Sequence, residues 1–165
     1  MATKGKAMSE TVRTGGCQCG AVRFRIHGEL GRASICHCRM CQKAFGGFFG
    51  PLVSAPEGGV EWTRGEPKYF QSSVNIDRGF CENCGTPLTY RYPGGLELAI
   101  GAFDERDDLA PQIQVNYASH IPWVTTIFDQ PVRDTGEDAV KQEQIISFQH
   151  PDHDTEHWPA KGLHL

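Results

Sequence analysis

The seven cysteines of this chain fall into three short groups, and no cysteine stands outside them. The groups are Cys17-Gln18-Cys19, Cys36-His37-Cys38-Arg39-Met40-Cys41 and Cys81-Glu82-Asn83-Cys84. Sulfurs one to three residues apart can converge on one metal ion, and Zn²⁺ is the usual occupant of such clusters. The sequence therefore predicts one closed site with four sulfur ligands and a second site with three.

The composition suggests one domain with a modest core and many turns. The chain has 165 residues, of which 39% are hydrophobic, and it contains 19 glycines and 10 prolines. A globular chain of this length buries roughly 70% of its unfolded surface. We expect each structural zinc to add on the order of 10 kcal/mol to the free energy of folding.

Charge and hydropathy exclude several classes of protein. The formal net charge of −4 argues against a general nucleic-acid binder, which would need a basic surface. No apolar run approaches membrane-spanning length, and residues 1–14 lack the apolar stretch of a secretory signal. We therefore expect a cytoplasmic protein, because clustered cysteines in a reducing compartment bind metals more often than they form disulfides.

Alternating side chains predict mostly β structure. Residues 22–27 alternate between apolar and polar, as expected for a half-buried strand. Glycine, proline, asparagine and aspartate separate further short segments of this kind. These expected strands are 48–53, 60–63, 68–71, 88–92, 96–100 and 113–117. The best helical candidate is 138–148. The expected fold is a single, mostly β domain with the zinc clusters on loops between strands.

Three regions are expected along the chain: a flexible arm at 1–12, a zinc domain at 13–148 and a tail at 149–165. The tail contains His150, His153, His157 and His164. Two of these histidines could face one way on a helix and bind a metal, but two prolines interrupt the segment. A solvated or loosely packed tail is the simpler interpretation.

Glycines indicate how two of the cysteine groups pair. Gly20 and Gly85 directly follow the last cysteine of the first and third groups. A backbone that folds two thiolates around one ion needs a residue that takes positive φ, and glycine does so without steric cost. We therefore predict that these two groups form one structural zinc site. Its ligands would be Cys17, Cys19, Cys81 and Cys84.

The middle group has three cysteines and no following glycine. In an extended Cys-x-Cys segment both sulfurs lie on one face and His37 on the other, so we expect His37 to pack or hydrogen-bond behind the site. Cys36, Cys38 and Cys41 would leave a fourth position for water or substrate, which is the layout of a catalytic zinc. A redox-sensitive thiol cluster and a distant fourth ligand are the alternatives.

The chemistry of three thiolates favours a thiol substrate over a water nucleophile. Thiolates donate strongly to zinc and weaken it as a Lewis acid, which disfavours hydrolysis by hydroxide. A soft site of this kind binds a further thiolate and favours its deprotonation. Arg39, Gln42 and Lys43 flank the cluster and could pair with the carboxylates of an acidic thiol such as glutathione.

Three segments carry the cysteine groups in a specific order and spacing: Gly15–Phe24, Cys36–Lys43 and Arg78–Leu88. With the later Gly101–Asp104 and Pro122-Trp123, they resemble the glutathione-dependent formaldehyde-activating enzyme (GFA) family over roughly residues 13 to 125. The resemblance implies a mostly β fold known as a β-tent and two Zn²⁺ per chain. It implies a structural zinc at the flanking groups and a catalytic zinc at the middle group.

The resemblance also implies an activity. It is the condensation of glutathione with formaldehyde to S-(hydroxymethyl)glutathione, or of a related thiol and aldehyde, which is formally a carbon–sulfur lyase reaction. The partners would be a small thiol and a small aldehyde, without nucleic acid or membrane. One position departs from the family pattern: members often carry Pro-x-x-His, whereas here Gln114 stands three residues after Pro111.

Two further functions fit parts of the sequence. A non-catalytic zinc module, either a glutathione carrier or a protein-interaction domain, would have its middle zinc closed by a fourth protein ligand or absent. A zinc deaminase is suggested faintly by His27-Gly28-Glu29 with the later Cys81-x-x-Cys84. Phe80 stands where that signature has proline, which argues against the deaminase.

Overall fold

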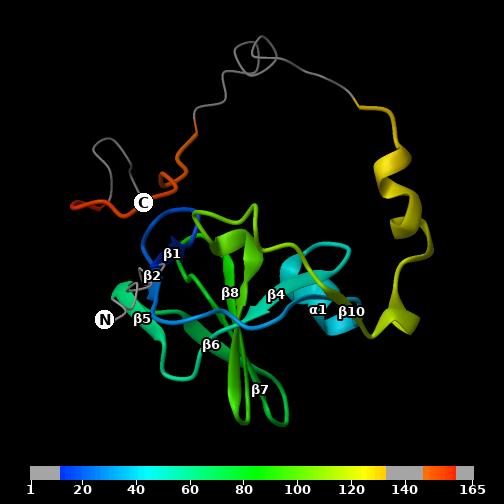
Figure 1. Cartoon of the computed structure of the whole chain (residues 1–165), viewed down its shortest axis with the longest axis horizontal. Helices are drawn as coiled ribbons and strands as arrows, with labels where there is room; N and C mark the ends of the chain where they lie inside the picture. The colour runs from blue at the N-terminus through cyan, green and yellow to red at the C-terminus, as the bar shows by residue number, and fades with distance from the viewer. Residues whose placement is uncertain (1–11, 133–146, 159–165) are drawn as a thin grey trace, which may run out of the picture.

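Two β-sheets form the framework of the described chain, which is residues 12–132 and 147–158 of this computed structural model (Figure 1). The smaller sheet has three antiparallel strands in the order β1-β2-β5. These strands are β1 (Arg13–Gly16), β2 (Arg23–Ile26) and β5 (Val60–Arg64). Gly15 of β1 also bridges to Phe103, so this sheet is tied to the segment between the strands at 95–99 and 113–115 of the larger sheet.

The larger sheet has seven strands in the order β10-β3-β4-β9-β8-β7-β6. All neighbours are antiparallel except β10 and β3, which are parallel. The strands are β3 (Ala33–Cys36), β4 (Gly50–Ser54), β6 (Lys68–Ser73), β7 (Ile76–Phe80), β8 (Pro87–Tyr92), β9 (Gly95–Ala99) and β10 (Ile113–Val115). The expected strands correspond to these within a few residues, whereas β1, β3 and β7 were not expected.

Helices in the described chain are short. They are α1 (Arg39–Phe45) and the 3₁₀ segments η1 (Ile100–Ala102), η2 (Tyr117–Ser119) and η3 (Pro122–Asp129). The sequence did not predict α1, which begins inside the middle cysteine group. Among the described residues, no helix is both long and apolar enough to cross a bilayer. The helix expected at 138–148 falls almost wholly outside the described residues.

Side chains from both sheets share one core. Phe24 of the smaller sheet is fully buried and meets Phe103 edge-on, with ring centroids 5.2 Å apart. Val53, Leu88 and Leu98 of the larger sheet belong to the same buried cluster. Because one core joins the two sheets, the predicted single, mostly β domain is confirmed.

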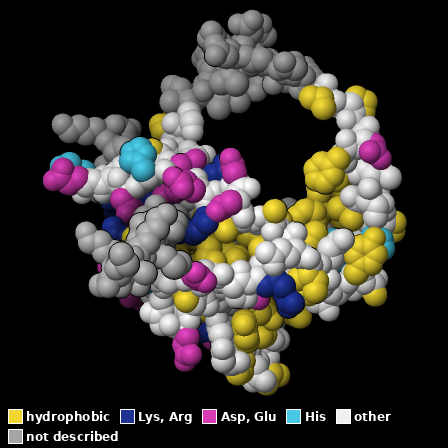
Figure 2. Space-filling model, in the orientation of Figure 1, with side chains coloured by type: hydrophobic (Ala, Val, Ile, Leu, Met, Phe, Trp, Pro, Cys, Tyr) yellow, Lys and Arg dark blue, Asp and Glu magenta, His cyan; other side chains and the backbone are white. Residues whose placement is uncertain are grey.

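The side of the molecule around η3 keeps apolar side chains at the surface. No residue of η3 is buried, and Figure 1 shows this segment standing away from the sheets. Trp123 packs edge-on against Phe48, with ring centroids 4.8 Å apart, yet both side chains remain exposed. Phe128 is exposed as well. Figure 2 shows hydrophobic side chains gathered on this side.

Arg23 departs from the alternation that predicted β2. It lies on the polar side of the pattern, yet only 3% of it is exposed. Its burial is possible because two aspartates accept hydrogen bonds from its guanidinium. Its Nη1 donates to Asp104 at 2.9 Å, and its Nη2 donates to Asp154 at 2.9 Å. Asp154 belongs to the tail, so this buried charge holds the tail against the smaller sheet.

Asp104 is ionised in the folded protein. Burial alone would raise its pKa, but hydrogen bonds from Arg23 and Thr14 outweigh burial and lower the pKa below its usual range. A carboxyl group whose pKa is lowered by folding stabilises the folded state above its unfolded pKa, near 4. That contribution is lost as the pH falls further.

We predict that Asp104→Asn lowers the free energy of unfolding at pH 7 by about 3 kcal/mol, because it leaves a buried guanidinium with one anionic partner fewer. The difference from the wild type should shrink as the pH falls below about 4, because Asp104 then becomes protonated in the unfolded chain and, at still lower pH, in the folded protein. Urea unfolding across pH measures both effects. Asp108→Asn is the matched control, since Asp108 pairs with Arg13 at the surface and should change stability too little to resolve. Equal losses in the two variants would contradict the prediction.

Candidate metal centres

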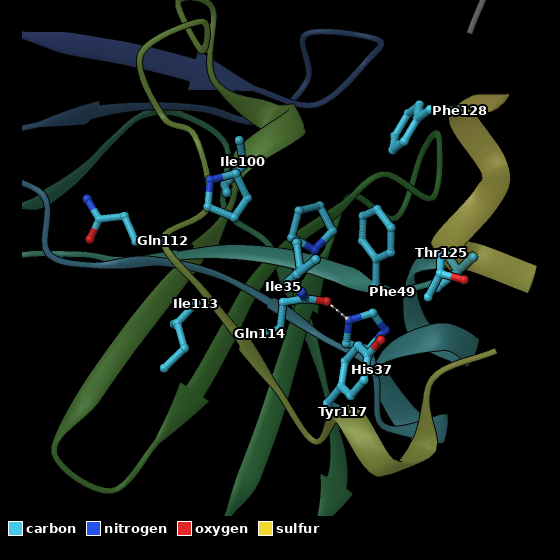
Figure 3. A pocket seen from close by; sticks show the side chains of 13 residues that line it. Ile35, His37, Phe49, Ile100, Gln112, Ile113, Gln114, Tyr117, Thr125 and Phe128 are labelled. Atoms are coloured by element: carbon cyan, nitrogen blue, oxygen red, sulfur yellow. Dashed lines mark hydrogen bonds between the residues drawn. The ribbon is translucent and has the colours of Figure 1, made fainter. Parts of the chain in front are cut away.

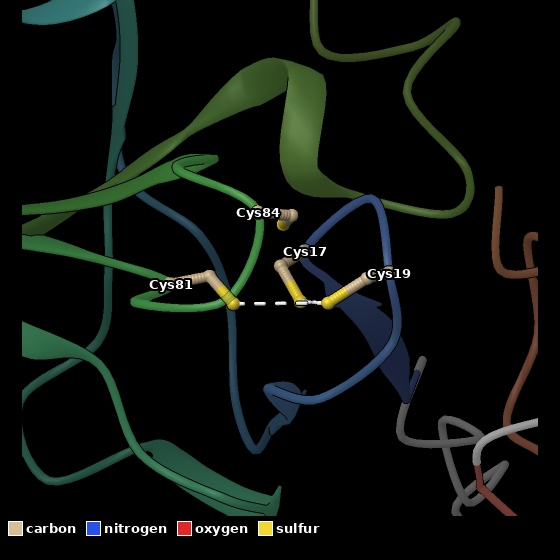
Figure 4. A group of neighbouring side chains, drawn as sticks. All are labelled: Cys17, Cys19, Cys81 and Cys84. Carbon is tan, nitrogen blue, oxygen red and sulfur yellow. Dashed lines mark hydrogen bonds between the residues drawn. The ribbon is translucent and has the colours of Figure 1, made fainter. Parts of the chain in front are cut away.

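The first and third cysteine groups meet in space, as Figure 4 shows. Cys17 and Cys19 lie in the turn after β1, and Cys81 and Cys84 lie in the turn after β7. The four sulfurs all lie within 4.8 Å of one another, with Cys17 and Cys19 Sγ atoms 3.5 Å apart. A tetrahedral zinc with Zn–S bonds near 2.3 Å needs sulfurs about 3.8 Å apart. The four sulfurs therefore fit a single zinc ion.

The two turns use their glycines as the sequence predicted. Gly20 has φ +78° and Gly85 has φ +77°, so both lie in the left-handed region. The Gly20 N–H donates to the Cys17 carbonyl at 3.0 Å, and the Gly85 N–H donates to the Cys81 carbonyl at 2.8 Å. These matching turns aim the two pairs of sulfurs at a common point.

The four thiols differ in acidity in the metal-free protein. Burial raises the pKa of Cys81 to about 11. Burial would also raise the pKa of Cys84, but hydrogen bonds from the hydroxyl and backbone of Thr86 outweigh it and lower the pKa to about 6. Cys84 is therefore a thiolate at neutral pH, and metal binding to this cluster would release protons from the other sulfurs.

The described part of the tail, 147–158, packs against the first of these turns. The backbone N–H of His150 donates to the Gln18 carbonyl at 2.7 Å, and the His150 side chain is 6% exposed. Trp158 Nε1 donates to the Cys19 carbonyl. The expectation of a solvated or loosely packed tail does not hold at His150, which is buried, or at Trp158, which is partly buried against the core. Among the described residues, no tail histidine joins a metal-ligand cluster.

The middle group forms a second cluster of three sulfurs. Cys36 ends β3, Cys38 caps the N-terminus of α1, and Cys41 lies in its first turn, with the three sulfurs within 4.8 Å of one another. The backbone N–H of Cys41 donates to Cys38 Sγ at 3.4 Å, which starts the helix and holds two of the sulfurs together. Among the described residues, no fourth Cys, His, Asp or Glu joins this cluster.

The three sulfurs line a cavity of about 560 Å³, which we call the thiol cavity. This volume lies within the range of small-molecule sites. The other side chains of the lining come from the larger sheet and from the segments next to it. They are Arg32, Ser34, Met40, Leu52, Ser54, Ile76, Arg78, Tyr90, Tyr92, Glu97, Val115 and Asn116. Cys38 is the least buried of the three cysteines and the sulfur most open to a ligand.

Two side chains that the sequence analysis did not single out donate to these sulfurs. Arg78 Nη2 lies 3.3 Å from Cys41 Sγ, and Asn116 Nδ2 lies 3.3 Å from Cys36 Sγ. Asn116 reaches its sulfur from a left-handed backbone with φ +54°, a conformation that asparagine tolerates better than most residues. Arg78 is the first residue of the segment Arg78–Leu88, which resembles the family. Nothing else in the sequence points to Arg78 as a site residue.

Arg78 is a buried cation whose neighbours are uncharged apart from the sulfurs. It is 4% exposed, its Nε donates to Ser72 Oγ at 3.3 Å, and its guanidinium lies 4.9 Å from the centre of the Tyr90 ring. Among the described residues, no carboxylate lies within ion-pair distance of it. Among the described residues, the sulfurs are therefore the groups in contact with Arg78 that can supply a balancing negative charge once they are ionised.

The sulfurs of this cluster also differ in acidity without metal. Burial raises the pKa of Cys41 to about 12 in spite of Arg78. Burial acts the same way on Cys36, but hydrogen bonds from the Cys38 backbone and from Asn116 outweigh it, so the pKa of Cys36 is lowered. Asn116 thus stabilises the thiolate that a metal ligand must become.

The three predicted substrate-contacting residues lie in two different environments. Arg39 and Lys43 are exposed on α1, on a neighbouring cavity that shares Met40 and Arg78 with the thiol cavity. Gln42 is buried instead, and its Nε2 donates to the His37 carbonyl at 2.8 Å and to the Ser119 carbonyl at 3.1 Å. Gln42 therefore anchors α1 rather than facing the thiol cavity.

His37 does not line the thiol cavity; Figure 3 shows it in a different cavity, where its ring points toward Gln114. It is 1% exposed and lines a second, larger cavity of about 1000 Å³, together with Ile35 and Phe49. Its Nε2 lies 2.9 Å from Gln114 Oε1. The prediction that His37 hydrogen-bonds behind the cluster is confirmed, and its partner is the residue that departs from the family pattern.

Comparison with known proteins agrees with the family resemblance of the cysteine segments. The model of the family described as glutathione-dependent formaldehyde-activating enzyme matches residues 12–119. An uncharacterized lyase of Schizosaccharomyces pombe is 32% identical over 81 residues, which are 49% of this chain. The match spans 58% of that relative's length. A Rhodobacter sphaeroides protein of known crystal structure has a TM-score of 0.51 at 21% identity, over 62% of this chain and 99% of its own, and it is similar in fold.

The glycines of the two cysteine turns, Gly20 and Gly85, offer a matched test of the contact between His150 and the first turn. Gly20 and Gly85 share the same φ, so alanine at either should cost about 1–2 kcal/mol from left-handed strain. A Cβ on Gly20 would also lie 2.2 Å from His150 Cδ2, whereas a Cβ on Gly85 would meet nothing within 4 Å. We predict that Gly20→Ala lowers the free energy of unfolding by about 1–3 kcal/mol more than Gly85→Ala.

Urea unfolding at equal zinc content measures this difference. Adding His150→Ala to Gly20→Ala should remove most of the excess loss, because the clash then has no partner. Equal losses for the two glycine variants would show that the tail does not pack on this turn in solution.

Proposed function

The chain belongs to the glutathione-dependent formaldehyde-activating enzyme family, and from this premise we propose that it is a carbon–sulfur lyase-type enzyme. Its reaction would be the condensation of glutathione, or a related thiol, with formaldehyde or a related small aldehyde. The observation that carries this proposal is the thiol cavity, in which three sulfurs and the buried Arg78 lie together. The name of the yeast relative, a lyase, supports the same class of reaction.

Both sulfur clusters suit Zn²⁺, because thiolates in tetrahedral spacing are its preferred ligands in reduced proteins. We assign Cys17, Cys19, Cys81 and Cys84 to a structural zinc and the three sulfurs of the thiol cavity to a catalytic zinc. Zinc bound at the latter would supply a soft electrophile that lowers the pKa of a thiol brought to it. Seven free cysteines need a reducing compartment, so we place the protein in the cytoplasm.

Arg78 would make the cavity accept an anionic sulfur. Three thiolates already exceed the two charges of a zinc ion by one, so a substrate thiolate would add a second uncompensated charge. A guanidinium 3.3 Å from Cys41 Sγ offsets one of these charges in a buried place where screening by water is weak. Asn116 would act in the same direction through its N–H on Cys36.

The rest of the lining would orient the two reactants. The serine and tyrosine hydroxyls of Ser34, Ser54, Tyr90 and Tyr92 are hydrogen-bonding groups for a thiol peptide and a small carbonyl compound. Holding both reactants in one cavity replaces a bimolecular encounter with a reaction between neighbours. A thiol long enough to pass Met40 would bring its carboxylates to Arg39 and Lys43.

Replacing one cysteine in each cluster should separate the two zinc roles. We predict that Cys38→Ser keeps a folded protein with about half the zinc but loses glutathione binding, because the sulfur most open to a ligand is gone. Cys84→Ser should instead unfold the domain, since a structural zinc contributes on the order of 10 kcal/mol. Circular dichroism, zinc analysis and calorimetric titration of glutathione measure these outcomes.

Wild-type glutathione affinity in Cys38→Ser would contradict the catalytic assignment of the middle cluster. A wild-type protein that binds glutathione without accelerating its reaction with formaldehyde would be a carrier, and the enzymatic proposal would fail.

Replacing Arg78 should test the need for a cation beside the sulfurs. We predict that Arg78→Gln weakens glutathione binding about 10-fold, because a charge-assisted interaction is lost, whereas Arg78→Lys keeps most of the affinity. The uncharged thiol 2-mercaptoethanol should show the same loss, since the effect acts on its sulfur. Arg91→Gln is the matched control, as Arg91 pairs with Asp77 outside the thiol cavity. Unchanged binding in Arg78→Gln would rule out this role.

A further inference from the structure

A row of side chains crosses the larger sheet beside the three sulfurs. Arg78 on β7 is directly opposite Tyr90 on β8. Tyr90 is in turn opposite Glu97 on β9, and Glu97 is opposite Ser54 on β4. Side chains directly opposite each other point to the same face of a sheet, so all four share one face, and all four line the thiol cavity. The sheet register therefore leads from the sulfur cluster to Glu97.

Glu97 is the only carboxyl group in the lining of the thiol cavity. It is partly buried, and among the described residues it makes no ion pair within 4.0 Å. A partly buried carboxyl group that makes no ion pair is less favourable in its charged form than one in water, because burial penalises that form. Its environment suits a group that gains and loses a proton.

The proposed reaction requires such a group. Addition of a thiol to an aldehyde moves one proton from sulfur to oxygen. The other polar side chains near the sulfurs are poorly suited to carry it: Arg78 stays protonated, and burial raises the pKa of Tyr90, which therefore keeps its proton. The three cysteines would be engaged as metal ligands. Glu97 is left as the side chain that can both take and return a proton.

We propose, on the basis of the function proposed above, that Glu97 is a catalytic residue that carries the proton from the thiol to the aldehyde oxygen. The Glu97 carboxylate takes the proton of the substrate S–H, and the sulfur electron pair forms the C–S bond to the carbonyl carbon. The C=O π electrons move to oxygen, which takes the proton from the Glu97 carboxylic acid. The product is a hemithioacetal, Glu97 returns to its carboxylate form, and no oxidant or reductant is needed.

The charged and titratable groups around the cavity influence the protonation of Glu97. They are Arg32 before β3, Cys36 on β3, Cys38 and Cys41 at the start of α1, Arg78 on β7, and Tyr90 and Tyr92 on β8. Burial raises the pKa of Glu97, while the Ser54 hydroxyl and the positive charge of Arg32 act against burial without cancelling it. A carboxyl group with a raised pKa transfers protons more effectively near neutral pH than an ordinary one.

Glu97→Gln tests the proposal in the full-length protein with both zinc sites filled. Glutathione and ¹³C-formaldehyde are the probes, and exchange NMR gives the rate above the uncatalysed background. We expect kcat to fall about 100-fold while the glutathione dissociation constant changes less than about 3-fold, since the amide keeps the shape but cannot carry the proton. The acidic limb of the wild-type pH profile should disappear. Glu57→Gln, the same change on an exposed turn, should behave as the wild type.

Ser54→Ala provides a second variant that leaves the carboxyl group in place. Removing the hydroxyl that lowers the pKa of Glu97 should move the acidic limb of the pH profile to higher pH, whatever the plateau rate becomes. This shift tests the assignment even if Glu97→Gln folds poorly, and a residue with a merely structural role would not produce it.

The outcomes separate this inference from the function on which it rests. A wild-type enzyme that accelerates the reaction, with Glu97→Gln at the same rate and the same pH profile, would overturn the role of Glu97 and leave the proposed function standing. An acidic limb that stays in place in Ser54→Ala would also overturn it. A wild-type protein that gives no acceleration over buffer would overturn both.

Discussion

Ionised sulfurs held within 4.8 Å of one another repel strongly, and the structure around both clusters compensates for that repulsion. Each cluster gathers segments that are far apart in the sequence, so the compensation also decides whether the two sheets close around one core. A divalent metal ion held by each cluster would supply most of the opposite charge. The protein supplies the rest through N–H groups aimed at individual sulfurs, as in the Val22 N–H that donates to Cys17 Sγ at 3.3 Å.

The two clusters differ in how much of their surface the chain itself covers. At the four-sulfur cluster the turns are tied by backbone bonds, and the tail adds His150 and Trp158 against the first turn. At the three-sulfur cluster the covering groups are a cation and an amide, Arg78 and Asn116, which lie beside a cavity of ligand size. Closure by the chain suits a structural ion, whereas an open cavity with a cation suits a reaction on an anionic sulfur.

The sequence predicted those features of the fold and of the sulfur clusters that depend on residues close together in the chain. The cysteine groups, the positive φ of Gly20 and Gly85 and most strands follow from spacing and alternation within a few residues. Strands β1, β3 and β7 were missed because they are short and do not alternate cleanly between apolar and polar. Helix α1 was missed because its N-terminal cap is a cysteine sulfur, which the usual capping residues do not suggest.

Contacts between distant segments could not be read from the sequence. Arg78 and Asn116 reach the sulfurs across 37 and 80 positions of the chain, and Glu97 joins them only through the register of β7, β8, β9 and β4. Arg23 looked like a solvent-facing residue because the carboxylates that bury it come from much later in the chain. Pairing of this kind depends on the closed fold, which the sequence analysis predicted in class but not in register.

The geometry around β3 also limits what the departure at position 114 can change. Cys36 and Cys38 face the thiol cavity, and His37, which stands between them, faces the second cavity, where its Nε2 meets Gln114 Oε1. An amide oxygen accepts, so this contact keeps the proton on Nε2 and fixes the ring. Gln114 therefore contacts His37 in the second cavity and not in the thiol cavity, where we propose that the thiol binds. The chemistry proposed for the thiol cavity depends on the sulfurs, Arg78 and Glu97, and a glutamine at 114 leaves all of them in place.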